Sequence, residues 1–286
     1  MVTKNLRWWQ KKDQRMPLLS FTSKVLRYSD KMSRLVISTD MDGTLLGHHS
    51  YDYAVAQPLL AALTAKKIPV ILNTSKTAAE IQFWQSELGL DLPAVIENGS
   101  AWINPGAKLH VHGATMHDLD AFLRAYPPHA TNFLTCEESI AHALTGLEGA
   151  ALQAARLRQF TVPLDFAVPT DAEHYQTLAR AQGLQCVRGG RFYSLQGQCS
   201  KGTTLKHVIA HFEQTWQDQV QLIALGDNLN DLDMLMAADV AVVVKSSDGQ
   251  YQVRPEKSDT IYTDAIAPVG WVEGITKAMQ KLSIRL

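Results

Sequence analysis

The chain has 286 residues, of which 46% are apolar and 19% are charged; this composition is typical of globular proteins and excludes a chain that is disordered throughout, fibrous or collagen-like. Its 27 basic and 28 acidic residues give a formal net charge of −1, so no overall field attracts nucleic acid or a membrane surface. The three cysteines form no C-x-x-C pair, so we expect a cytoplasmic protein without a disulfide framework. No apolar run reaches the roughly 18 residues that span a bilayer. Together with the net charge, this predicts neither a membrane partner nor a nucleic-acid partner.

The first 34 residues differ from the rest in charge. They contain nine Lys and Arg residues and two Asp residues, a local charge of 9 − 2 = +7, which leaves −1 − 7 = −8 for the remainder. The best apolar stretch, residues 16–21, is short and contains Pro17, unlike the apolar region of a secretory signal. We therefore predict a disordered basic extension over residues 1–32. A basic arm that touches an acidic partner is the alternative.

Short apolar runs then alternate with helical patterns. Apolar runs over residues 35–38, 68–72, 94–96, 222–225 and 240–244 each end in polar residues, as strands buried on both faces do. Helices are predicted over residues 58–63, 78–88 and 202–212; Thr77 and Glu80 form a capping box for the second, and Gly89 ends it. This alternation predicts an α/β fold with a Rossmann-like parallel sheet.

The alternation loosens between residues 105 and 196. Pro127-Pro128, a helical stretch over residues 147–158 and the glycine-containing turn at 188–191 are typical of a separate α+β unit. We predict that residues 105–196 form an inserted cap domain, and that residues 33–104 and 197–286 form the core. An inserted domain of this kind commonly serves as a lid.

Polar residues follow the first two predicted strands. Asp40 and Asp42 leave the first strand two residues apart, so one carboxylate could attack an electrophile while the other handles protons; two solvated turn residues are the alternative. Thr74 and Ser75 follow the second strand and offer hydroxyl and N–H donors to an anion, or they cap the next helix.

Two further groups complete the pattern. Lys201 begins a predicted helix, where its ammonium and the free N–H groups could face a phosphate, although a solvated lysine is also common there. Asp227, Asn228, Asn230 and Asp231 follow the strand over 222–225 and supply the hard oxygen ligands that suit Mg²⁺. Ligands bind at the carboxyl ends of parallel strands, so four such groups together predict one site.

The order of these residues resembles the four motifs of the haloacid dehalogenase-like superfamily. The motifs are Asp40-x-Asp42-Gly43-Thr44-Leu45, Thr74, Lys201 and Gly226-Asp227-x-x-Asn230-Asp231. The insertion between the second and third motifs resembles the α+β cap, of type IIB, that sugar phosphatases of this superfamily carry.

Several segments resemble one branch of the superfamily, the mannosyl-3-phosphoglycerate phosphatases. They are His49-Ser50-Tyr51, residues 69–80, Glu97-Asn98-Gly99, Gly189-Gly190-Arg191-Phe192 and Pro268-Val269-Gly270-Trp271. The chain departs from that family at Thr161-Val162-Pro163, where an acidic segment is expected, and at Ser194, where a His often occurs.

The resemblance implies a role for each matched residue. Asp40 would be the nucleophile and Asp42 the general acid and base, with Thr74 and Lys201 holding the phosphate oxygens. Mg²⁺ would be bound by Asp40, Asp42, Asp227 and Asp231. Residues implied in substrate binding are Gly43, Thr44, Ser75, Lys76, Glu97, Asn98, Arg188, Gly190, Arg191 and Asn230. Arg188 and Arg191 lie beside glycines and offer cations for a second anion of the substrate.

The expected activity is Mg²⁺-dependent hydrolysis of mannosyl- or glucosyl-3-phosphoglycerate, a small-molecule substrate, by a monomer or homodimer, through an aspartyl-phosphate. A general sugar phosphatase or a sucrose-phosphatase-like enzyme is the alternative among hydrolases. A non-catalytic phosphosugar-binding regulator is the alternative from another class. The presence of Asp40 and Asp42 argues against it, because binding alone requires neither carboxylate.

Overall fold

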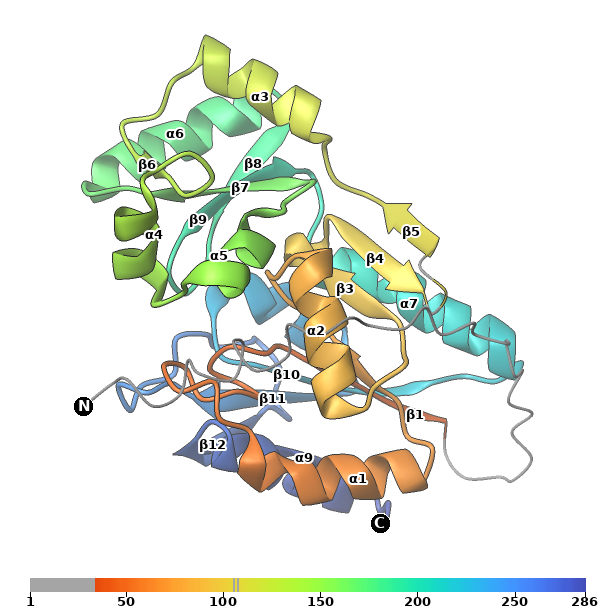
Figure 1. Ribbon diagram of the computed structural model, residues 1–286. Coiled ribbons are helices and arrows are strands. Elements are labelled where there is room, and N and C mark those ends of the chain that lie inside the picture. Colours follow the sequence, from red (N-terminus) through yellow and green to blue (C-terminus); the bar gives the residue numbers. More distant parts are fainter. Residues whose placement is uncertain (1–33, 105, 107) are drawn as a thin grey trace.

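The computed structural model describes residues 34–104, 106 and 108–286. Its centre is a five-stranded sheet in the order β12-β11-β10-β1-β2, with every neighbouring pair parallel (Figure 1). The strands are β1 (Leu35–Thr39), β2 (Val70–Leu72), β10 (Gln221–Gly226), β11 (Val240–Lys245) and β12 (Ile261–Ile266). The predicted α/β class is confirmed, and apolar runs predicted four of these strands. The predicted extension over residues 1–32 lies outside the described residues.

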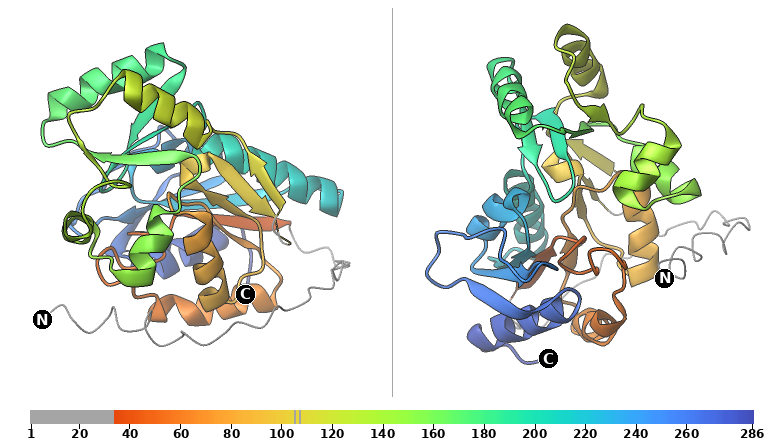
Figure 2. Two further views of the ribbon diagram at one scale, coloured as in Figure 1. Left: turned by 45° about the horizontal axis from the view of Figure 1, so that its top comes forward. Right: turned by 90° about the vertical axis from the view of Figure 1, so that its left-hand side faces the viewer.

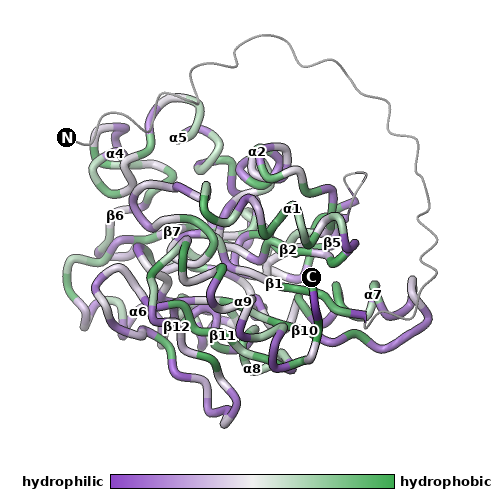
Figure 3. Tube along the Cα trace, turned by 90° about the horizontal axis from the view of Figure 1, so that it is seen from below, coloured by the Kyte–Doolittle hydropathy of each residue, from purple (hydrophilic) through white to green (hydrophobic). Residues whose placement is uncertain are grey.

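Helices cover both faces of this sheet (Figures 1 and 2). One face carries α1 (Gln57–Ala65), α2 (Ala78–Leu88) and α9 (Val269–Lys281), and the other carries α7 (Lys201–Trp216) and α8 (Leu232–Ala237). Within β1, Ile37 packs with the first group and Val36 with the second, because successive side chains of a strand point to opposite faces. Figure 3 shows the resulting hydrophobic strands β10 and β11 in the interior. Burial on both sides explains why these strands are continuously apolar.

A second sheet contains β3 (Ala94–Ile96), β4 (Ala101–Asn104) and β5 (Lys108–Val111). The strand expected over 94–96 is present, but it pairs with β4 in antiparallel fashion rather than joining the central sheet. One parallel bridge, between Asn73 and Val95, connects it to the end of β2. Because β2 is only three residues long and ends before Asn73, this bridge provides a single point of pairing.

A third, four-stranded antiparallel sheet has the order β6-β7-β9-β8. It comprises β6 (Thr131–Asn132), β7 (Thr161–Asp165), β8 (Leu184–Arg188) and β9 (Tyr193–Gly197), with α3 (Met116–Ala125), α4 (Glu138–Thr145), α5 (Gly149–Arg156) and α6 (Pro169–Ala181) around it. This unit lies above the central sheet in Figure 1 and has its own apolar core, in which Leu119, Val162 and Tyr175 are buried. The cap boundaries at residues 105 and 196 stay a prediction.

Side-chain caps define the starts of α2 and α7, which follow loops that contain predicted site residues. Thr77 caps α2 through its side chain and Glu80 returns the bond, so the predicted capping box is present, and Gly89 ends the helix in a left-handed conformation. Ser200 caps α7 in the same way with Thr203, which places Lys201 in the first turn. No helix in the described part of the chain is both long and apolar enough to cross a membrane.

Candidate active site

The carboxyl ends of the central strands bring the predicted motifs together. Asp40 follows β1, Thr74 follows β2 and Asp227 follows β10, while Lys201 begins α7 beside them. All four residues are buried. Parallel strands end at one edge of a sheet, so residues separated by nearly 190 positions meet there.

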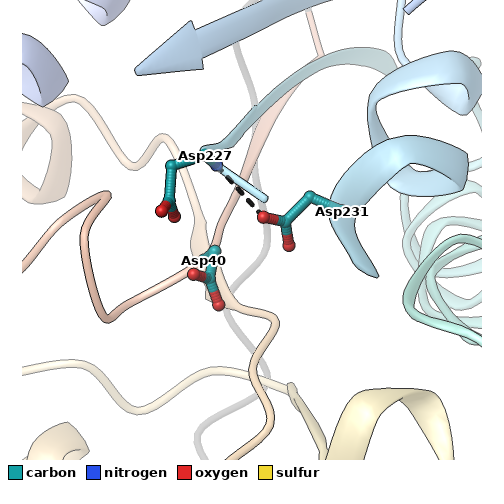
Figure 4. A group of neighbouring side chains, drawn as sticks. All are labelled: Asp40, Asp227 and Asp231. Atoms are coloured by element: carbon teal, nitrogen blue, oxygen red, sulfur yellow. Dashed lines mark hydrogen bonds between the residues drawn. The ribbon is translucent and has the colours of Figure 1, made fainter. Parts of the chain in front are cut away.

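Three carboxylates form the centre of this site (Figure 4). Each of Asp40, Asp227 and Asp231 offers an oxygen, and these oxygens lie within 4.8 Å of one another. Asp231 comes from η5 (Leu229–Asp231), a 3-10 turn after β10, and its Oδ2 accepts the N–H groups of Asp227 at 3.1 Å and Asn228 at 3.0 Å. The turn therefore fixes the carboxylate of Asp231 against the end of β10.

Lys201 is the cation of this cluster. Its Nζ lies 2.6 Å from Oδ1 of Asp40 and 2.6 Å from Oδ1 of Asp231, and its side chain is only 1% exposed. Burial alone would lower the pKa of Lys201, but Asp231 and Asp40 outweigh burial and raise it. Lys201 therefore stays charged and links the nucleophile predicted from the sequence to the loop after β10.

One lysine does not balance three carboxylates. With all three ionised, the cluster carries −3 + 1 = −2 in a buried place. Burial and the neighbouring Asp231 raise the pKa of Asp40 to about 7 against the opposing effect of Lys201, and burial and Asp40 also raise the pKa of Asp227. Carboxylate oxygens in this arrangement suit a divalent cation such as Mg²⁺, whose charge would relieve the repulsion. The donor set therefore fits the predicted metal.

Gly43 and Thr44 hold Asp227 in place. The hydroxyl of Thr44 donates to Oδ1 of Asp227 at 2.8 Å. Gly43 has a φ of +84°, and a Cβ at that position would lie 2.7 Å from Oδ2 of Asp227. Glycine is therefore required by both the backbone conformation and the space beside the carboxylate.

We expect Gly43→Ala to lower kcat/KM at least about tenfold, because the added methyl displaces Asp227. Gly89→Ala is the matched control: Gly89 also has a positive φ, +66°, but no heavy atom lies within 4 Å of the position of its Cβ. Both variants should lose about 1 kcal/mol or more of unfolding free energy from backbone strain. Denaturant unfolding and phosphate release measure the two effects, and normal activity in Gly43→Ala would contradict the expectation.

Asp42 lies outside the three-carboxylate group. Its Oδ2 lies 2.8 Å from Nζ of Lys76, while Oδ1 is buried and has no hydrogen-bond partner. Burial alone would raise the pKa of Asp42, but Lys76 and Arg191 outweigh it and hold the pKa below its usual range. One oxygen of Asp42 is therefore paired with Lys76, and the expected role of Asp42 as a metal ligand stays a prediction.

The remaining polar groups around the centre come from three loops. Oγ1 of Thr74 accepts the N–H of Lys76 at 3.2 Å. Asn98 accepts from Nδ2 of Asn230 at 3.0 Å and donates to Oγ of Ser194 at 3.1 Å. Oδ1 of Asn230 is buried without a partner, so one acceptor remains beside the site.

Two of the residues implied in substrate binding lie elsewhere. Both oxygens of the buried Glu97 accept bonds from the segment before and at the start of β7: from the N–H of Gln159 at 3.0 Å, the N–H of Phe160 at 3.1 Å and the hydroxyl of Thr161 at 2.7 Å. Arg188 is exposed at the end of β8 and lines a different cavity. Its Nη1 donates to the hydroxyl of Tyr193. Glu97 therefore connects the core to β7, and Arg188 does not line the active-site pocket.

A pocket lies between the carboxylate cluster and the third sheet, and residues from both sides line it. The predicted residues that line it are Asp40, Asp42, Ser75, Lys76, Asn98, Gly190, Arg191, Asp227 and Asn230. Arg191 crosses the pocket: Nη1 donates to the hydroxyl of Tyr51 at 2.9 Å and Nη2 to the carbonyl of His48 at 2.8 Å. Arg191 therefore ties the loop before β9 to the loop after β1.

Some pocket residues had no assigned role in the sequence-based site. His48 and Tyr51 follow Asp42 closely, and the resemblance around Tyr51 was the available signal. Thr145 ends α4 and Arg158 lies between α5 and β7; neither is part of a recognisable motif. Only the folded chain brings these two positions to the pocket.

The comparisons with known proteins agree with this geometry. The family model of haloacid dehalogenase-like hydrolases matches residues 37–146 and 187–254. The chain is 30% identical to a glucosyl-3-phosphoglycerate/mannosyl-3-phosphoglycerate phosphatase of Methanococcoides burtonii over 270 residues, which cover 86% of this chain and 97% of the relative. A phosphatase of the same description from Persephonella marina is 28% identical over 267 residues, with coverage of 87% and 98%.

The fold has solved counterparts as well. A subclass IIB sugar phosphatase of the haloacid dehalogenase superfamily superposes with a TM-score of 0.60 at 16% identity, over 88% of this chain and all of the other. Its likeness confirms the expected fold. The chain therefore belongs to the haloacid dehalogenase-like hydrolases and, among them, to the family of phosphatases that contains the two relatives from Methanococcoides burtonii and Persephonella marina.

Proposed function

We propose that this phosphatase hydrolyses mannosyl- or glucosyl-3-phosphoglycerate to the glycosylglycerate and phosphate, with Mg²⁺ and through an aspartyl-phosphate. The observation that carries the proposal is the buried group of Asp40, Asp227, Asp231 and Lys201, of which Asp40 and Asp227 line a pocket that also contains arginines. The description of the two relatives supports the choice of substrate.

The nucleophile is Asp40. One of its oxygens is bound to Lys201 and the other is left to attack phosphorus. Attack forms an aspartyl-phosphate, and the ester oxygen leaves with its electron pair. Asp40, Asp227 and the surrounding oxygens would hold Mg²⁺, which would supply positive charge to offset that of the carboxylates and the phosphoryl group. Lys201 lies 2.6 Å from the nucleophile and Thr74 follows the neighbouring strand β2, and both supply donors for phosphate oxygens.

Asp42 transfers protons in both steps of the reaction. The leaving alkoxide is a strong base and needs a proton, which Asp42 donates as a general acid; Asp42 then takes a proton from the water that attacks the aspartyl-phosphate. Lys76 and Arg191 keep this carboxyl group ionised before substrate binds. A substrate phosphate beside Asp42 brings negative charge that shifts this balance toward the protonated form.

The test is phosphate release from a substrate panel with Mg²⁺. The panel contains mannosyl- and glucosyl-3-phosphoglycerate, 3-phosphoglycerate, hexose 6-phosphates, sucrose 6-phosphate and p-nitrophenyl phosphate. We expect the glycosyl-3-phosphoglycerates to have the highest kcat/KM, because only they can occupy the phosphoryl site and the arginine-containing pocket together. A preference for a simple hexose phosphate or for sucrose 6-phosphate would overturn the substrate assignment, and binding of the panel without turnover would favour a regulatory role.

A further inference from the structure

The pocket contains three permanently charged cations in the described part of the chain: Lys76, Arg158 and Arg191. Lys76 is paired, because its Nζ lies 2.8 Å from Asp42 and 3.8 Å from Glu80. Its positive charge is therefore already balanced by two carboxylates of the core.

Most N–H donors of Arg191 bind other groups of the protein. Nη1 donates to the hydroxyl of Tyr51 and, at 3.3 Å, to the carbonyl of Thr145, and Nη2 donates to the carbonyl of His48. Three of its five N–H groups are therefore engaged, and a substrate carboxylate could bind Nη1 only by breaking the two bonds of that nitrogen. Arg191 is thus placed to hold the two sides of the pocket together.

Arg158 differs from Lys76 in its ion pairing and from Arg191 in its hydrogen bonds. Its Nη1 alone makes its hydrogen bonds, to the carbonyl of Ser75 at 3.0 Å and to the hydroxyl of Thr161 at 2.8 Å. Nε is buried and has no partner, and Nη2 donates to none of the described residues. No described carboxylate forms an ion pair with Arg158 either, so a half-buried cation remains without a counter-ion. Leaving such a group unpaired costs free energy that an anionic ligand would recover.

The free edge has a specific shape. Nε and Nη2 form the side of the guanidinium whose two N–H bonds are parallel, and this fork matches the two oxygens of a carboxylate. The occupied Nη1 holds the guanidinium against Ser75 and Thr161, so the fork is oriented before any ligand binds.

The position of Arg158 also suits the proposed substrate. Ser75 follows Thr74, to which the proposed mechanism gives the phosphate oxygens, so Arg158 binds the loop that carries this residue. In a glycosyl-3-phosphoglycerate only two carbon atoms separate the ester oxygen from the carboxylate carbon. The second anion of the substrate must therefore lie close to the first, and Arg158 and Ser75 both line the pocket that contains the proposed nucleophile.

We propose that Arg158 binds the carboxylate of the substrate's glycerate group with Nε and Nη2 and thereby sets the preference for phosphoglycerate esters. This inference rests on the proposed function. It replaces Arg188, which lies outside the pocket, and Arg191, three of whose five N–H donors bind the protein, as the residue that recognises the second anion.

The experiment compares two substrates that differ at one group. Mannosyl-3-phosphoglycerate carries the carboxylate, and mannosylglycerol 3-phosphate has a CH₂OH in its place. We expect Arg158→Ala to lower kcat/KM for the first substrate by roughly 10- to 100-fold and to leave the second within about threefold of the parent. Arg158→Lys should fall between, because it keeps the charge but loses the fork. Arg180→Gln, which changes an exposed arginine of α6, is the matched control and should behave as the parent.

The outcomes distinguish carboxylate binding by Arg158 from a structural role of this residue. If Arg158→Ala slows both substrates equally, the arginine acts by holding the Ser75 loop and the proposal is overturned. A selective loss cannot come from partial unfolding, because the carboxylate-free substrate reports on the same folded molecules. If the parent itself hydrolyses the two substrates equally well, the carboxylate contributes nothing to selection and the Arg158 proposal is overturned, whereas the proposed function fails only if the parent does not hydrolyse mannosyl-3-phosphoglycerate. Melting temperatures of all variants accompany the kinetic measurements.

Discussion

Asp40→Asn is expected to reduce phosphate release by about a thousandfold or more, because an amide cannot form the aspartyl-phosphate. The variant should nevertheless fold. Burial raises the pKa of Asp40 to about 7, which means that the folded protein disfavours the ionised carboxylate relative to the unfolded chain. At neutral pH and without a divalent cation, the neutral amide removes this cost, and we expect the melting temperature to stay equal to that of the parent or to rise.

The measurement combines initial rates of phosphate release with rapid-quench detection of a phosphorylated protein. The parent should show the phosphorylated form and Asp40→Asn should not. Asp91→Asn, at an exposed position before β3, controls for the change in net charge. Activity of Asp40→Asn within tenfold of the parent would rule out covalent catalysis by this residue.

Asp227→Asn is expected to lower activity at least about a hundredfold at a Mg²⁺ concentration that saturates the parent. The substitution changes the charge of the cluster from −2 to −1 and removes one hard oxygen ligand, while the hydroxyl of Thr44 can still donate to the remaining amide oxygen. The loss therefore concerns metal affinity more than local packing.

Two readouts test this prediction. Mg²⁺ titrations of activity should show a higher half-saturating concentration or no activity for Asp227→Asn. Mg²⁺ should also raise the melting temperature of the parent, since a ligand that binds only the folded state stabilises it, and this shift should be smaller in the variant. Full activity of the parent in excess chelator would refute the requirement for a divalent cation.

The positions of Glu97 and Arg188 show that a motif alone does not determine whether its residues line the pocket. Both belong to segments that resemble the phosphatase family, but Glu97 binds Gln159, Phe160 and Thr161, and Arg188 is exposed beside another cavity. Contacts of this kind depend on where the third sheet lies over the core. No local pattern around either residue specifies that position.

Arg158, in contrast, lies in no recognised motif but lines the pocket. It lies in the segment between α5 and β7, where the chain departs from the acidic sequence that the family comparison led us to expect at Thr161-Val162-Pro163. Nothing in its neighbourhood marks it as a site residue. Its importance follows from two nitrogens without partners and from the carbonyl of Ser75, which is 83 residues away in the sequence.

The sequence by itself determined the parallel sheet, except for its edge strand β12, and the positions at which the candidate catalytic residues follow the strands. Continuous apolar runs specify strands buried on both faces. Asp40 and Asp227 directly follow such strands and Thr74 is the second residue after one, so their convergence at one sheet edge is a consequence of parallel topology. The tertiary structure alone decided which side chains surround the substrate. Pocket residues from the third sheet and its connections are brought to the core by packing between separate units, and this packing depends on long-range contacts that have no periodicity along the chain.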